Sequence, residues 1–374
     1  MEFLRRTWAE ISKSALINNL NEIKKNSADA AVCAVVKANA YGHSDRLVSP
    51  VLDQNGADGF AVSNIEEAIS LRRIGIKKPI LILGYTPADL VLSLTENNIS
   101  QCVYSIEYAE LLSKNAVAAG VTVKIHLKLD TGMARLGFDL RDDSLSGISE
   151  AIYAAGLKNL YLEGVFTHFA AADSDTEQFT GFTQAQYARF IKGVEKLKAA
   201  GLCPNTVHCD NSAAICSKKY TLDMVRPGII LYGLKPDRDF KINLNLTPVM
   251  TLKSVVSFVK TVTAGTPVSY GMTYKAERDM KIATVAAGYA DGYPRLLSNR
   301  GEVLIHKKRA KIIGRVCMDQ TVIDVSDIED IKMGDEVILF GKELPVDDLA
   351  RLCNTINYEI VCQVAPRVPR ILVD

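Results

Sequence analysis

The fold of this chain is decided by the stretch Ala31-Val-Cys-Ala-Val-Val-Lys-Ala-Asn-Ala-Tyr-Gly-His43. Its first six residues are apolar, as in a strand that is buried on both faces of a parallel sheet. The strand then delivers one amine, that of Lys37, into a polar loop. Burial disfavours an ammonium group and lowers its pKa, which suits Lys37 to Schiff-base chemistry. The alternative is a structural lysine whose stem leaves the strand end and reaches solvent.

Similar apolar runs recur along the first two thirds of the chain and alternate with segments of helical period. This alternation is typical of βα units around a parallel sheet. Eight such strands within about 200 residues predict a closed (β/α)8 TIM barrel. The predicted strands lie near residues 31–39, 59–64, 80–85, 101–105, 123–130, 162–169, 205–211 and 224–230.

The segments between the strands are predicted to be helices, and a further helix precedes the first strand. Ser12 or Ser14 is the expected N-cap of that first helix. Gly75 and Gly201 are expected to end two of the others. The clearest predicted helices span residues 12–26, 65–74 and 179–200.

The pattern changes after about residue 240, where closely spaced β-like runs predict a smaller, mostly β domain. A polar stretch with a proline, residues 235–240, is the expected boundary, which gives domains 1–240 and 241–374. One short helix is expected near residues 345–356. The predicted strands of this domain are 249–262, 281–287, 311–316, 321–325 and 336–340.

Bulk composition argues for a small-molecule ligand. The net charge of the 374 residues is +1, so no global field attracts nucleic acid or a membrane surface. The N-terminus lacks the apolar core of a signal peptide and no apolar run of about 20 residues is present, so a cytoplasmic protein is expected. The eight cysteines show neither CxxC nor metal-type spacing and are interpreted as reduced, mostly buried thiols.

Polar side chains follow several of the predicted strands. In barrels of this kind the active site lies at the C-terminal ends of the strands, so these side chains are expected to converge on one rim. They are Lys37, Asn39 and Tyr41 after the first strand, Lys128, Asp130 and Arg135 at the fifth, Thr167 and His168 at the sixth, Asp210, Asn211 and Ser212 at the seventh, and Arg226 and Gly228 at the eighth.

Two of these loops suggest an anion site. The segment 211–214 is expected to run from a strand directly into a helix N-terminus, and Gly228 allows close approach of a backbone. Taken singly, Ser212 is equally compatible with a helix cap and Gly228 with a turn. The loops after strands seven and eight are the usual phosphate site of such barrels. A phosphate site opposite a Schiff-base lysine implies pyridoxal 5'-phosphate, the cofactor that needs both.

Seven segments resemble the alanine racemase family. They occur in order along essentially the whole chain, and several are highly specific. They are Val36-Lys-Ala-Asn-Ala-Tyr-Gly-His43, His126-Leu-Lys-Leu-Asp-Thr-Gly-Met-Ala-Arg-Leu-Gly137, Arg226-Pro-Gly-Ile229, Val268-Ser-Tyr-Gly271, Gly288-Tyr-Ala-Asp-Gly292, Cys317-Met-Asp319 and Arg367-Val-Pro-Arg370.

The resemblance implies an isomerase that interconverts L-alanine and D-alanine with two catalytic bases. Lys37 would hold the cofactor and act as one base, and Tyr270 of the partner subunit would be the other. Active sites would then be shared in a head-to-tail homodimer. His168 and Arg226 match the residues that assist the tyrosine, and Arg226 also matches the arginine facing the pyridine nitrogen. In a bacterium the product would supply peptidoglycan.

The resemblance also assigns the surrounding residues. Arg135 matches a residue near the cofactor phenolate and the substrate carboxylate, and Lys128 a lysine that is often carbamylated and buttresses that arginine. Met318 and Asp319 match the partner's face of the substrate pocket. The remaining matches are the cofactor contacts Tyr41, Asn211, Ser212, Gly228 and Ile229, and the entrance residues Tyr289 and Asp173.

Three positions depart from the family pattern, one of them Ser44, where glycine often follows the histidine. Family members commonly carry a tyrosine before Arg367, with its hydroxyl at the phosphate, whereas this chain has Pro366. Proline offers neither a hydroxyl nor an N–H, so a phosphate anchor is expected to be lost or supplied from elsewhere. That position also borders the space for the substrate side chain, so serine is a credible second substrate beside alanine. Asp210 stands where a small residue is usual, and its carboxylate would repel a phosphate if it pointed inward.

Two other functions fit parts of the sequence. A decarboxylase of basic amino acids shares the barrel and β-domain plan but needs an acidic partner for the ring nitrogen, and Arg226 argues against it. A non-catalytic pyridoxal phosphate carrier shares the first strand but lacks a second domain. Tyr270 and Cys317-Met-Asp319 therefore favour a racemase over a carrier.

Overall fold

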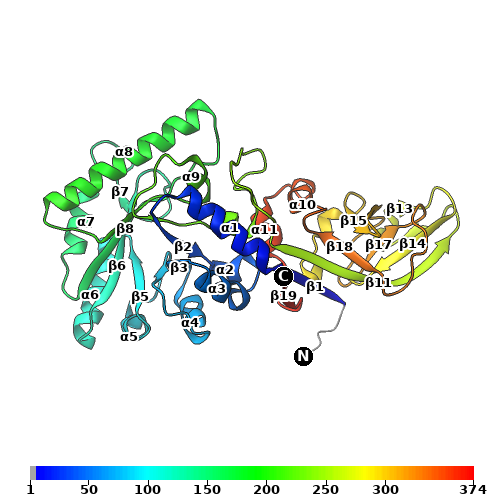
Figure 1. Cartoon of the computed structure of the whole chain (residues 1–374), viewed down its shortest axis with the longest axis horizontal. Helices are drawn as coiled ribbons and strands as arrows, with labels where there is room; N and C mark the ends of the chain where they lie inside the picture. Colours follow the sequence, from blue (N-terminus) through cyan, green and yellow to red (C-terminus); the bar gives the residue numbers. More distant parts are fainter. Residues whose placement is uncertain (1–5) are drawn as a thin grey trace.

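Eight parallel strands form the barrel in the computed structural model, which describes residues 6–374. Consecutive barrel strands from β2 to β9 pair with one another, and the last strand, β10, pairs with the first, β2 (Figure 1). Most are shorter than predicted because the chain turns toward the site at their C-terminal ends. They are β2 (Ala31–Val35), β3 (Gly59–Val62), β4 (Ile80–Ile82), β5 (Ile99–Val103), β6 (Val123–Asp130), β8 (Leu160–Phe166), β9 (Thr206–His208) and β10 (Met224–Val225).

The barrel is nearly closed between β9 and β10. These two strands share no ladder, but the backbone N–H of Asp223 donates to the carbonyl of Val207 at 3.1 Å and that of Arg226 to Asp210 at 3.0 Å. The bonds hold the ends of the two strands together. The loops that follow β9 and β10 are thereby kept side by side at the rim.

Helices cover the barrel, and their caps are those expected from the sequence. Ser12 rather than Ser14 caps the first helix, because its hydroxyl accepts the N–H of Ala15 at 3.1 Å. Gly75 and Gly201 follow their helices with φ of +93° and +80°, conformations that glycine adopts without a steric penalty. The helices are α1 (Lys13–Asn26), α2 (Lys37–Tyr41), α3 (Asp45–Gln54), α4 (Ile65–Arg73), α5 (Val91–Glu96), α6 (Ile106–Ala119), α7 (Ile148–Ala155), α8 (Glu177–Ala199) and α9 (Ser212–Ser217).

The second module is mostly β, as predicted, and extends from the barrel along the long axis of the molecule (Figure 1). Its main sheet has the order β16-β15-β18-β11-β1-β19, and β14 pairs with both β11 and β17. Its strands are β11 (Met250–Val262), β14 (Met280–Val285), β15 (Glu302–Ile305), β16 (Lys308–Lys311), β17 (Thr321–Asp324), β18 (Glu336–Phe340) and β19 (Arg370–Val373), joined by β1 (Thr7–Ser12).

Two local predictions for this module are wrong. Residues 312–316 are not a strand: Ile312 makes a single bridge to Ile323, and Gly314, with φ +73°, interrupts the extended backbone. A second helix was also missed. The predicted helix appears as α10 (Val346–Leu352), and α11 (Asn357–Cys362) follows and packs against α2 of the barrel.

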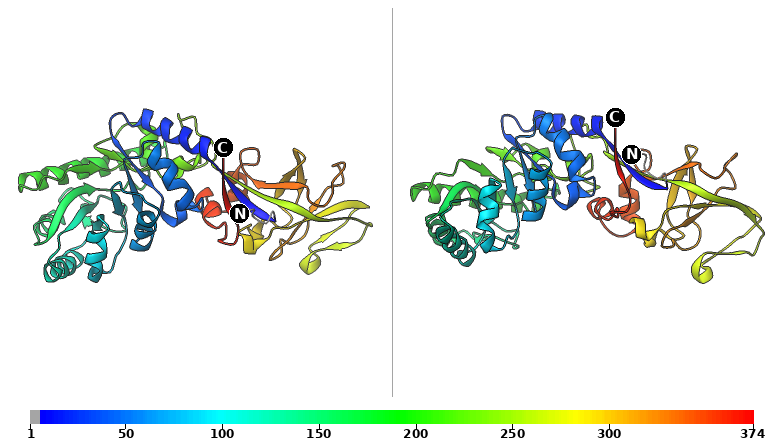
Figure 2. Two further views of the ribbon diagram at one scale, coloured as in Figure 1. Left: turned by 60° about the horizontal axis from the view of Figure 1, so that its bottom comes forward. Right: turned by 90° about the horizontal axis from the view of Figure 1, so that it is seen from below.

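The two ends of the described chain meet at the junction of the modules. Strand β1 pairs antiparallel with β11 and parallel with β19, so residues 7–12 belong to the second sheet although they precede the barrel (Figure 2). Arg370 on β19 donates to the carbonyl of Gly42 at 2.9 Å. The β module is thus tied to the loop that follows Lys37.

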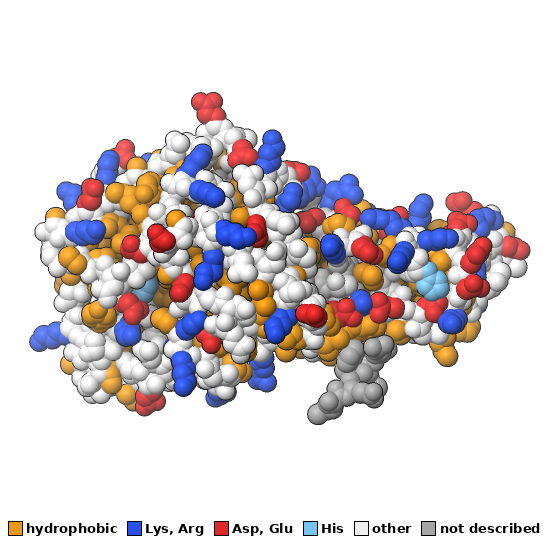
Figure 3. Space-filling model, in the orientation of Figure 1, with side chains coloured by type: hydrophobic (Ala, Val, Ile, Leu, Met, Phe, Trp, Pro, Cys, Tyr) orange, Lys and Arg blue, Asp and Glu red, His pale blue; other side chains and the backbone are white. Residues whose placement is uncertain are grey.

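Most buried apolar side chains form one core that continues through both modules, and a smaller cluster around Val262, Met280 and Ile313 lies in the β module. The surface carries acidic and basic side chains interspersed, in keeping with the net charge of +1 (Figure 3). None of the helices formed by residues 6–374 is long and apolar enough to span a bilayer.

Candidate active site

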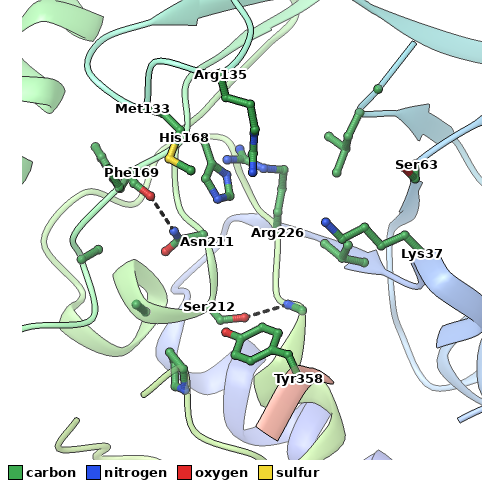
Figure 4. A pocket seen from close by; sticks show the side chains of 18 of the residues that line it. Lys37, Ser63, Met133, Arg135, His168, Phe169, Asn211, Ser212, Arg226 and Tyr358 are labelled. Carbon is green, nitrogen blue, oxygen red and sulfur yellow. Dashed lines mark hydrogen bonds between the residues drawn. The ribbon is translucent and has the colours of Figure 1, made fainter. Parts of the chain in front are cut away.

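A cavity of about 620 Å³ opens at the C-terminal rim of the barrel (Figure 4). Its walls come from the loops after several barrel strands and from α11 of the β module. Ten residues predicted for the site line it: Lys37, Tyr41, Lys128, Arg135, His168, Asp173, Asn211, Ser212, Arg226 and Gly228.

Five residues that the resemblance assigned to the site do not line this cavity, and neither do the rim candidates Asn39, Asp130, Thr167 and Asp210. Ile229 is fully buried directly behind Gly228. Tyr270, Tyr289, Met318 and Asp319 lie on the β module, and the exposed fraction of Tyr270 is 71%. In a single chain the cavity therefore has no contribution from the expected second base.

Lys37 enters the cavity because the backbone after it makes a left-handed turn. Residues 38–41 have φ of 52–54°, a conformation that costs a non-glycine residue roughly 1–2 kcal/mol. Hydrogen bonds offset part of this cost. The N–H of Ala38 donates to Glu67 at 2.7 Å, and the side chain of Asn39 accepts the N–H of Asp45 at 3.0 Å. Backbone strain of this kind is concentrated at functional sites.

Three nitrogen bases of the cavity wall have lowered pKa values. Burial lowers the pKa of Lys37, and the charge on Arg135 lowers it further. Burial likewise lowers the pKa of Lys128, with added repulsion from Arg135 and Arg226. The pKa of His168 lies well below its usual value because the ring is buried and close to the charge on Arg226. The cavity therefore places bases of lowered pKa beside the fixed positive charge of the arginines.

One end of the cavity has the properties of an anion cradle. Asn211, not Ser212, caps α9, since its side chain accepts the N–H of Ala214 at 3.1 Å. The Ser212 hydroxyl instead accepts the N–H of Gly228 at 2.9 Å. A Cβ on residue 228 would lie 2.6 Å from the Tyr41 hydroxyl, so only glycine leaves room there. The hydroxyl groups of Tyr41 and Ser212 fit the donors that a phosphate needs.

Tyr358 on α11 is a lining residue that the sequence analysis missed. Its ring lies 6.0 Å from the ring of Tyr41, and Figure 4 shows its hydroxyl beside Ser212. Pro366 is exposed and is not part of the cavity wall. An aromatic hydroxyl reaches that end from α11, which agrees with the alternative that the anchor is supplied from elsewhere in the chain.

Further lining residues that the sequence analysis missed lie at or after the second, third and sixth barrel strands and at the end of α11. They include Ser63, Leu83, Gly84, Phe166 and Cys362. Residues 63, 83 and 84 could have been found, because they lie within or at the ends of predicted strands. Asp210 does not line the cavity: it is fully buried and accepts the hydroxyl of Thr221 at 3.0 Å. Burial raises the pKa of Asp210, and because the residue lies outside the cavity wall, its carboxyl does not face an anion there.

Arg226 is held rigidly in the cavity wall. The exposed fraction of its side chain and backbone is 3%, and one guanidinium nitrogen donates to the carbonyls of Thr167 at 2.8 Å and Cys209 at 3.0 Å. The guanidinium carbon lies 5.2 Å from the centroid of the Phe166 ring. These contacts fix the plane of a group that can only donate hydrogen bonds.

The four distal site residues form one surface of the β module. The Ser269 hydroxyl, next to Tyr270, donates to the carbonyl of Arg315 at 2.6 Å. The N–H groups of Tyr289 and Ala290 donate to the carbonyls of Cys317 and Met318 at 3.0 and 2.9 Å. These hydrogen bonds hold together the loops around residues 269, 289 and 317, which are about 20 to 50 residues apart in the sequence. The loops expose apolar side chains that the rest of this chain does not cover.

Comparison with known proteins places the whole chain in one family. The alanine racemase N-terminal domain matches residues 11–236 and the C-terminal domain residues 249–372. Alanine racemase of Desulforamulus reducens is 45% identical over 98% of both chains, and alanine racemase 1 of Clostridium acetobutylicum is 42% identical over 99% of this chain and 96% of that protein.

Solved structures give the same result. The alanine racemase of Clostridium difficile 630 superposes with a TM-score of 0.92 at 40% identity, over 100% of this chain and 97% of that one. A complex of that protein with cycloserine gives a TM-score of 0.90 at 38% identity, over 100% and 96%. The chain therefore belongs to the alanine racemase family of pyridoxal-phosphate-dependent isomerases.

Proposed function

We propose that this enzyme interconverts L-alanine and D-alanine by moving the Cα proton between two opposed bases. The observation that carries the proposal is the placement of Lys37, whose amine enters a cavity that has Arg226 in its wall and hydroxyl groups at one end. Relatives named alanine racemase, more than 40% identical over nearly the whole chain, support alanine as the substrate.

Lys37 is the base on one face of the substrate. When bound, pyridoxal phosphate makes the Cα proton of an amino acid acidic. The depressed pKa of Lys37 leaves more of its amine neutral near pH 7, and only a neutral amine can accept that proton. Arg135, which helps to lower this pKa, is assigned to the substrate carboxylate, for which a guanidinium is the best partner.

Tyr270 of the partner subunit is the base on the other face. Its own chain leaves it 71% exposed, on a strained turn in which Ser269 has φ +63° and Met272 φ +48°. A head-to-tail homodimer would insert this turn into the other subunit's cavity. Met318, 54% exposed on the same surface, would then cover the substrate together with Asp319.

Two residues of the cavity are proposed to assist the tyrosine. A phenol with a pKa of about 10 is a poor base at neutral pH, so a neighbour must take its proton. Neutral His168 can accept a hydrogen bond from the phenol, and the charge of Arg226 beside it would favour the phenolate. Arg226 would face the pyridine nitrogen of the cofactor, where a group that only donates hydrogen bonds would disfavour protonation of that nitrogen.

The remaining site residues hold the cofactor or border the entrance. Tyr41, Asn211, Ser212, Gly228 and Ile229 are proposed for the phosphate end, with Tyr358 added from the geometry. Asp173 in the cavity wall and Tyr289 of the partner subunit are proposed for the entrance. Lys128 is proposed to buttress Arg135.

An exchange experiment tests the reaction. Purified enzyme with pyridoxal phosphate is incubated with L-alanine, and separately with L-serine, in deuterated water. The proposal requires loss of optical activity with deuterium entering Cα of alanine, abolished in Lys37→Ala and restricted to one face in Tyr270→Phe. Faster turnover of serine than of alanine would overturn the assignment of alanine as the preferred substrate. Absence of exchange with both amino acids would overturn the assignment as a racemase.

A mixing experiment tests the shared site. Subunits carrying Lys37→Ala are dissociated and reassociated with subunits carrying Tyr270→Phe. In a shared arrangement each mixed dimer contains one intact pair of bases, so random mixing restores about a quarter of the wild-type activity. Each variant alone stays inactive. No recovery in the mixture, with mixed dimers detected by mass spectrometry, would mean that Lys37 and Tyr270 act within one chain.

Further predictions extend beyond the site. We infer a division of the chain into domains 1–240 and 241–374, supported by the two matched family domains, with strand β1 contributed to the second sheet. The supply of D-alanine for peptidoglycan and a cytoplasmic location remain predictions.

A further inference from the structure

A row of four polar side chains runs beneath the cavity through the barrel interior. Arg226 Nη1 lies 2.6 Å from His208 Nδ1, His208 Nε2 lies 2.9 Å from His126 Nδ1, and His126 Nε2 lies 3.3 Å from a carboxylate oxygen of Glu163. The first three residues are almost fully buried. Only Arg226 lines the cavity, and nothing in the proposed reaction uses the other three.

The direction of every hydrogen bond in this row is fixed by its two ends. An arginine can only donate, so His208 Nδ1 accepts and its proton lies on Nε2. That proton is donated to His126 Nδ1, which leaves the His126 proton on Nε2, facing the carboxylate. Burial holds the pKa of His208 well below its usual value, in agreement with a neutral ring. The row therefore carries a positive charge at Arg226, a negative charge at Glu163 and two neutral imidazoles between them.

The backbone is shaped to hold this row. Between β6 and β8, Ile125 pairs with Leu162 but His126 pairs with Gly164, so Glu163 is the extra residue of a β-bulge. A side chain at position 164 would place its Cβ 2.4 Å from the His126 ring. The bulge and the glycine are two independent features that serve the same contact.

Glu163 is held in its charged carboxylate form, which can only accept hydrogen bonds. Burial alone would raise its pKa, but hydrogen bonds from His126 and Ser100 outweigh this and hold the pKa at about 2. Lys124 lies 3.5 Å from its second oxygen. Because a carboxylate cannot donate, the far end of the row cannot reverse.

We propose that Glu163 and His126 are positioning residues that act through His208 to keep Arg226 aimed at the cofactor. The proposal rests on the proposed position of Arg226 at the pyridine nitrogen. An amide at position 163 could donate to His126, which would move both imidazole protons to Nδ1. His208 would then present a proton to Arg226, and two donors would face each other. The guanidinium would leave its place in the cavity wall.

The test uses Glu163→Gln with Ser100→Ala and Lys124→Gln as matched controls, which remove other partners of Glu163 and leave its acceptor in place. Nitrogen-15 NMR of the histidine rings reads the protonated nitrogen directly, and the chain has only five histidines. His208→Asn and His126→Asn assign the signals. Wild-type holoenzyme and both controls are expected to carry the proton on Nε2 at both rings, and Glu163→Gln is expected to carry it on Nδ1.

Kinetics and cofactor binding provide the second readout. Glu163→Gln is expected to lower kcat and cofactor affinity by about tenfold each, the effect of one charge-assisted hydrogen bond, with KM for alanine little changed. Glu163→Asp, which keeps a carboxylate, is expected to restore the Nε2 protons and most of kcat. A merely structural role would change stability in Glu163→Gln and leave the ring protons in place.

Specific outcomes overturn the proposal. A wild-type His208 protonated on Nδ1 would overturn it without any variant, even if Glu163→Gln failed to fold. Wild-type kcat and cofactor affinity in a Glu163→Gln enzyme would do the same. Failure of the racemase proposal is separate, because it would appear as absence of alanine exchange in the wild-type enzyme, while the NMR result tests the row itself.

Discussion

The hydroxyl of Tyr41 lies so close to Gly228 that a Cβ at position 228 would be 2.6 Å from its oxygen. The space beside Tyr41 therefore requires glycine at position 228. The contact joins the loop after β10 to the turn after Lys37.

Gly228→Ala is expected to weaken cofactor binding by about tenfold, because the methyl group displaces a hydroxyl donor from the phosphate cradle. The measurement is a fluorescence titration of cofactor-free enzyme with pyridoxal phosphate. Gly181→Ala is the control, since nothing lies within 4 Å of its added Cβ and it is in a helix. Equal affinity in the two variants would show that the cradle tolerates the methyl group.

Tyr358 and Pro366 provide a paired test of the phosphate end. Tyr358→Phe removes the hydroxyl that points at Ser212 and is expected to weaken cofactor affinity by about threefold to tenfold. Pro366→Tyr is expected to leave cofactor affinity unchanged, because position 366 is exposed and outside the cavity wall. Both are read in the same titration, and a gain of affinity in Pro366→Tyr would restore the role that the sequence suggested.

The barrel could be predicted because its signals are local. Each strand is a short apolar run, each helix has an amphipathic period with a cap, and active sites of such barrels lie at one rim. Nine of the lining residues therefore needed only the strand count to be brought together, and Asp173 was added by the resemblance.

The missed features depend on contacts between distant segments. Strand β1 has only six residues and pairs with segments about 240 and 360 residues away, for which it carries no local signal. Tyr358 reaches the cavity only because α11 packs on α2, and Gly314 breaks an apolar run that otherwise resembles a strand. Sequence could name Tyr270 by resemblance, but only the fold places it on an exposed surface outside its own cavity.

His43 is expected to make stability depend on pH. The ring is fully buried, and burial lowers its pKa from 6.5 to about 4, against the hydrogen bond with the Tyr41 carbonyl at 2.9 Å. Between these values the unfolded chain binds a proton that the folded chain does not, so stability rises with pH. The contribution is complete above pH 6.5 and is lost as the pH falls to about 4.

The shift corresponds to about 3 kcal/mol of unfolding free energy. Urea unfolding at several pH values checks this, with His43→Gln as the comparison. The difference between wild type and variant is expected to change with pH only in that window. If the difference in unfolding free energy between wild type and variant is the same at pH 4 and pH 7, then His43 has the same pKa in the folded enzyme as in the unfolded chain.

Asp291 is expected to be a main anchor of the proposed dimer surface. It is fully buried, accepts Arg367 Nε at 2.8 Å and the N–H of Gly288 at 3.0 Å, and also binds Arg6. Arg367 in turn binds Asp319 at 2.7 Å. One carboxylate thus fixes the loops that carry Tyr289 and Asp319.

Asp291→Asn is expected to lower the unfolding free energy by about 2 kcal/mol, less than a fully buried pair because both arginines are 41% exposed. Dimer dissociation, measured by ultracentrifugation, should become easier in parallel. Glu302→Gln, which removes an exposed pair with Arg309, should cost under about 1 kcal/mol. If the two substitutions lower the unfolding free energy equally, Asp291 is not a main anchor of this surface.

Lys128 is expected to carry a carbamate. It is 3% exposed, has no ion-pair partner among residues 6–374, and has a pKa lowered by burial and by Arg135 and Arg226. A neutral amine attacks CO2: a bond forms between Nζ and the carbon, and Nζ loses a proton. The product is an anion beside two arginines, so the modification replaces repulsion with attraction.

Enzyme equilibrated with carbon-13 bicarbonate should therefore show one carbamate signal in its carbon NMR spectrum. The signal should be retained in Lys124→Gln, lost in Lys128→Gln, and weakened as the pH falls, because protonation removes the nucleophilic amine. A wild-type spectrum without this signal at saturating bicarbonate would show that Lys128 buttresses Arg135, if at all, as a free amine. In that case acetate should not rescue kcat in Lys128→Ala. If the wild-type enzyme does carry the carbamate, acetate should take the place of the lost carboxylate and restore part of kcat in this variant.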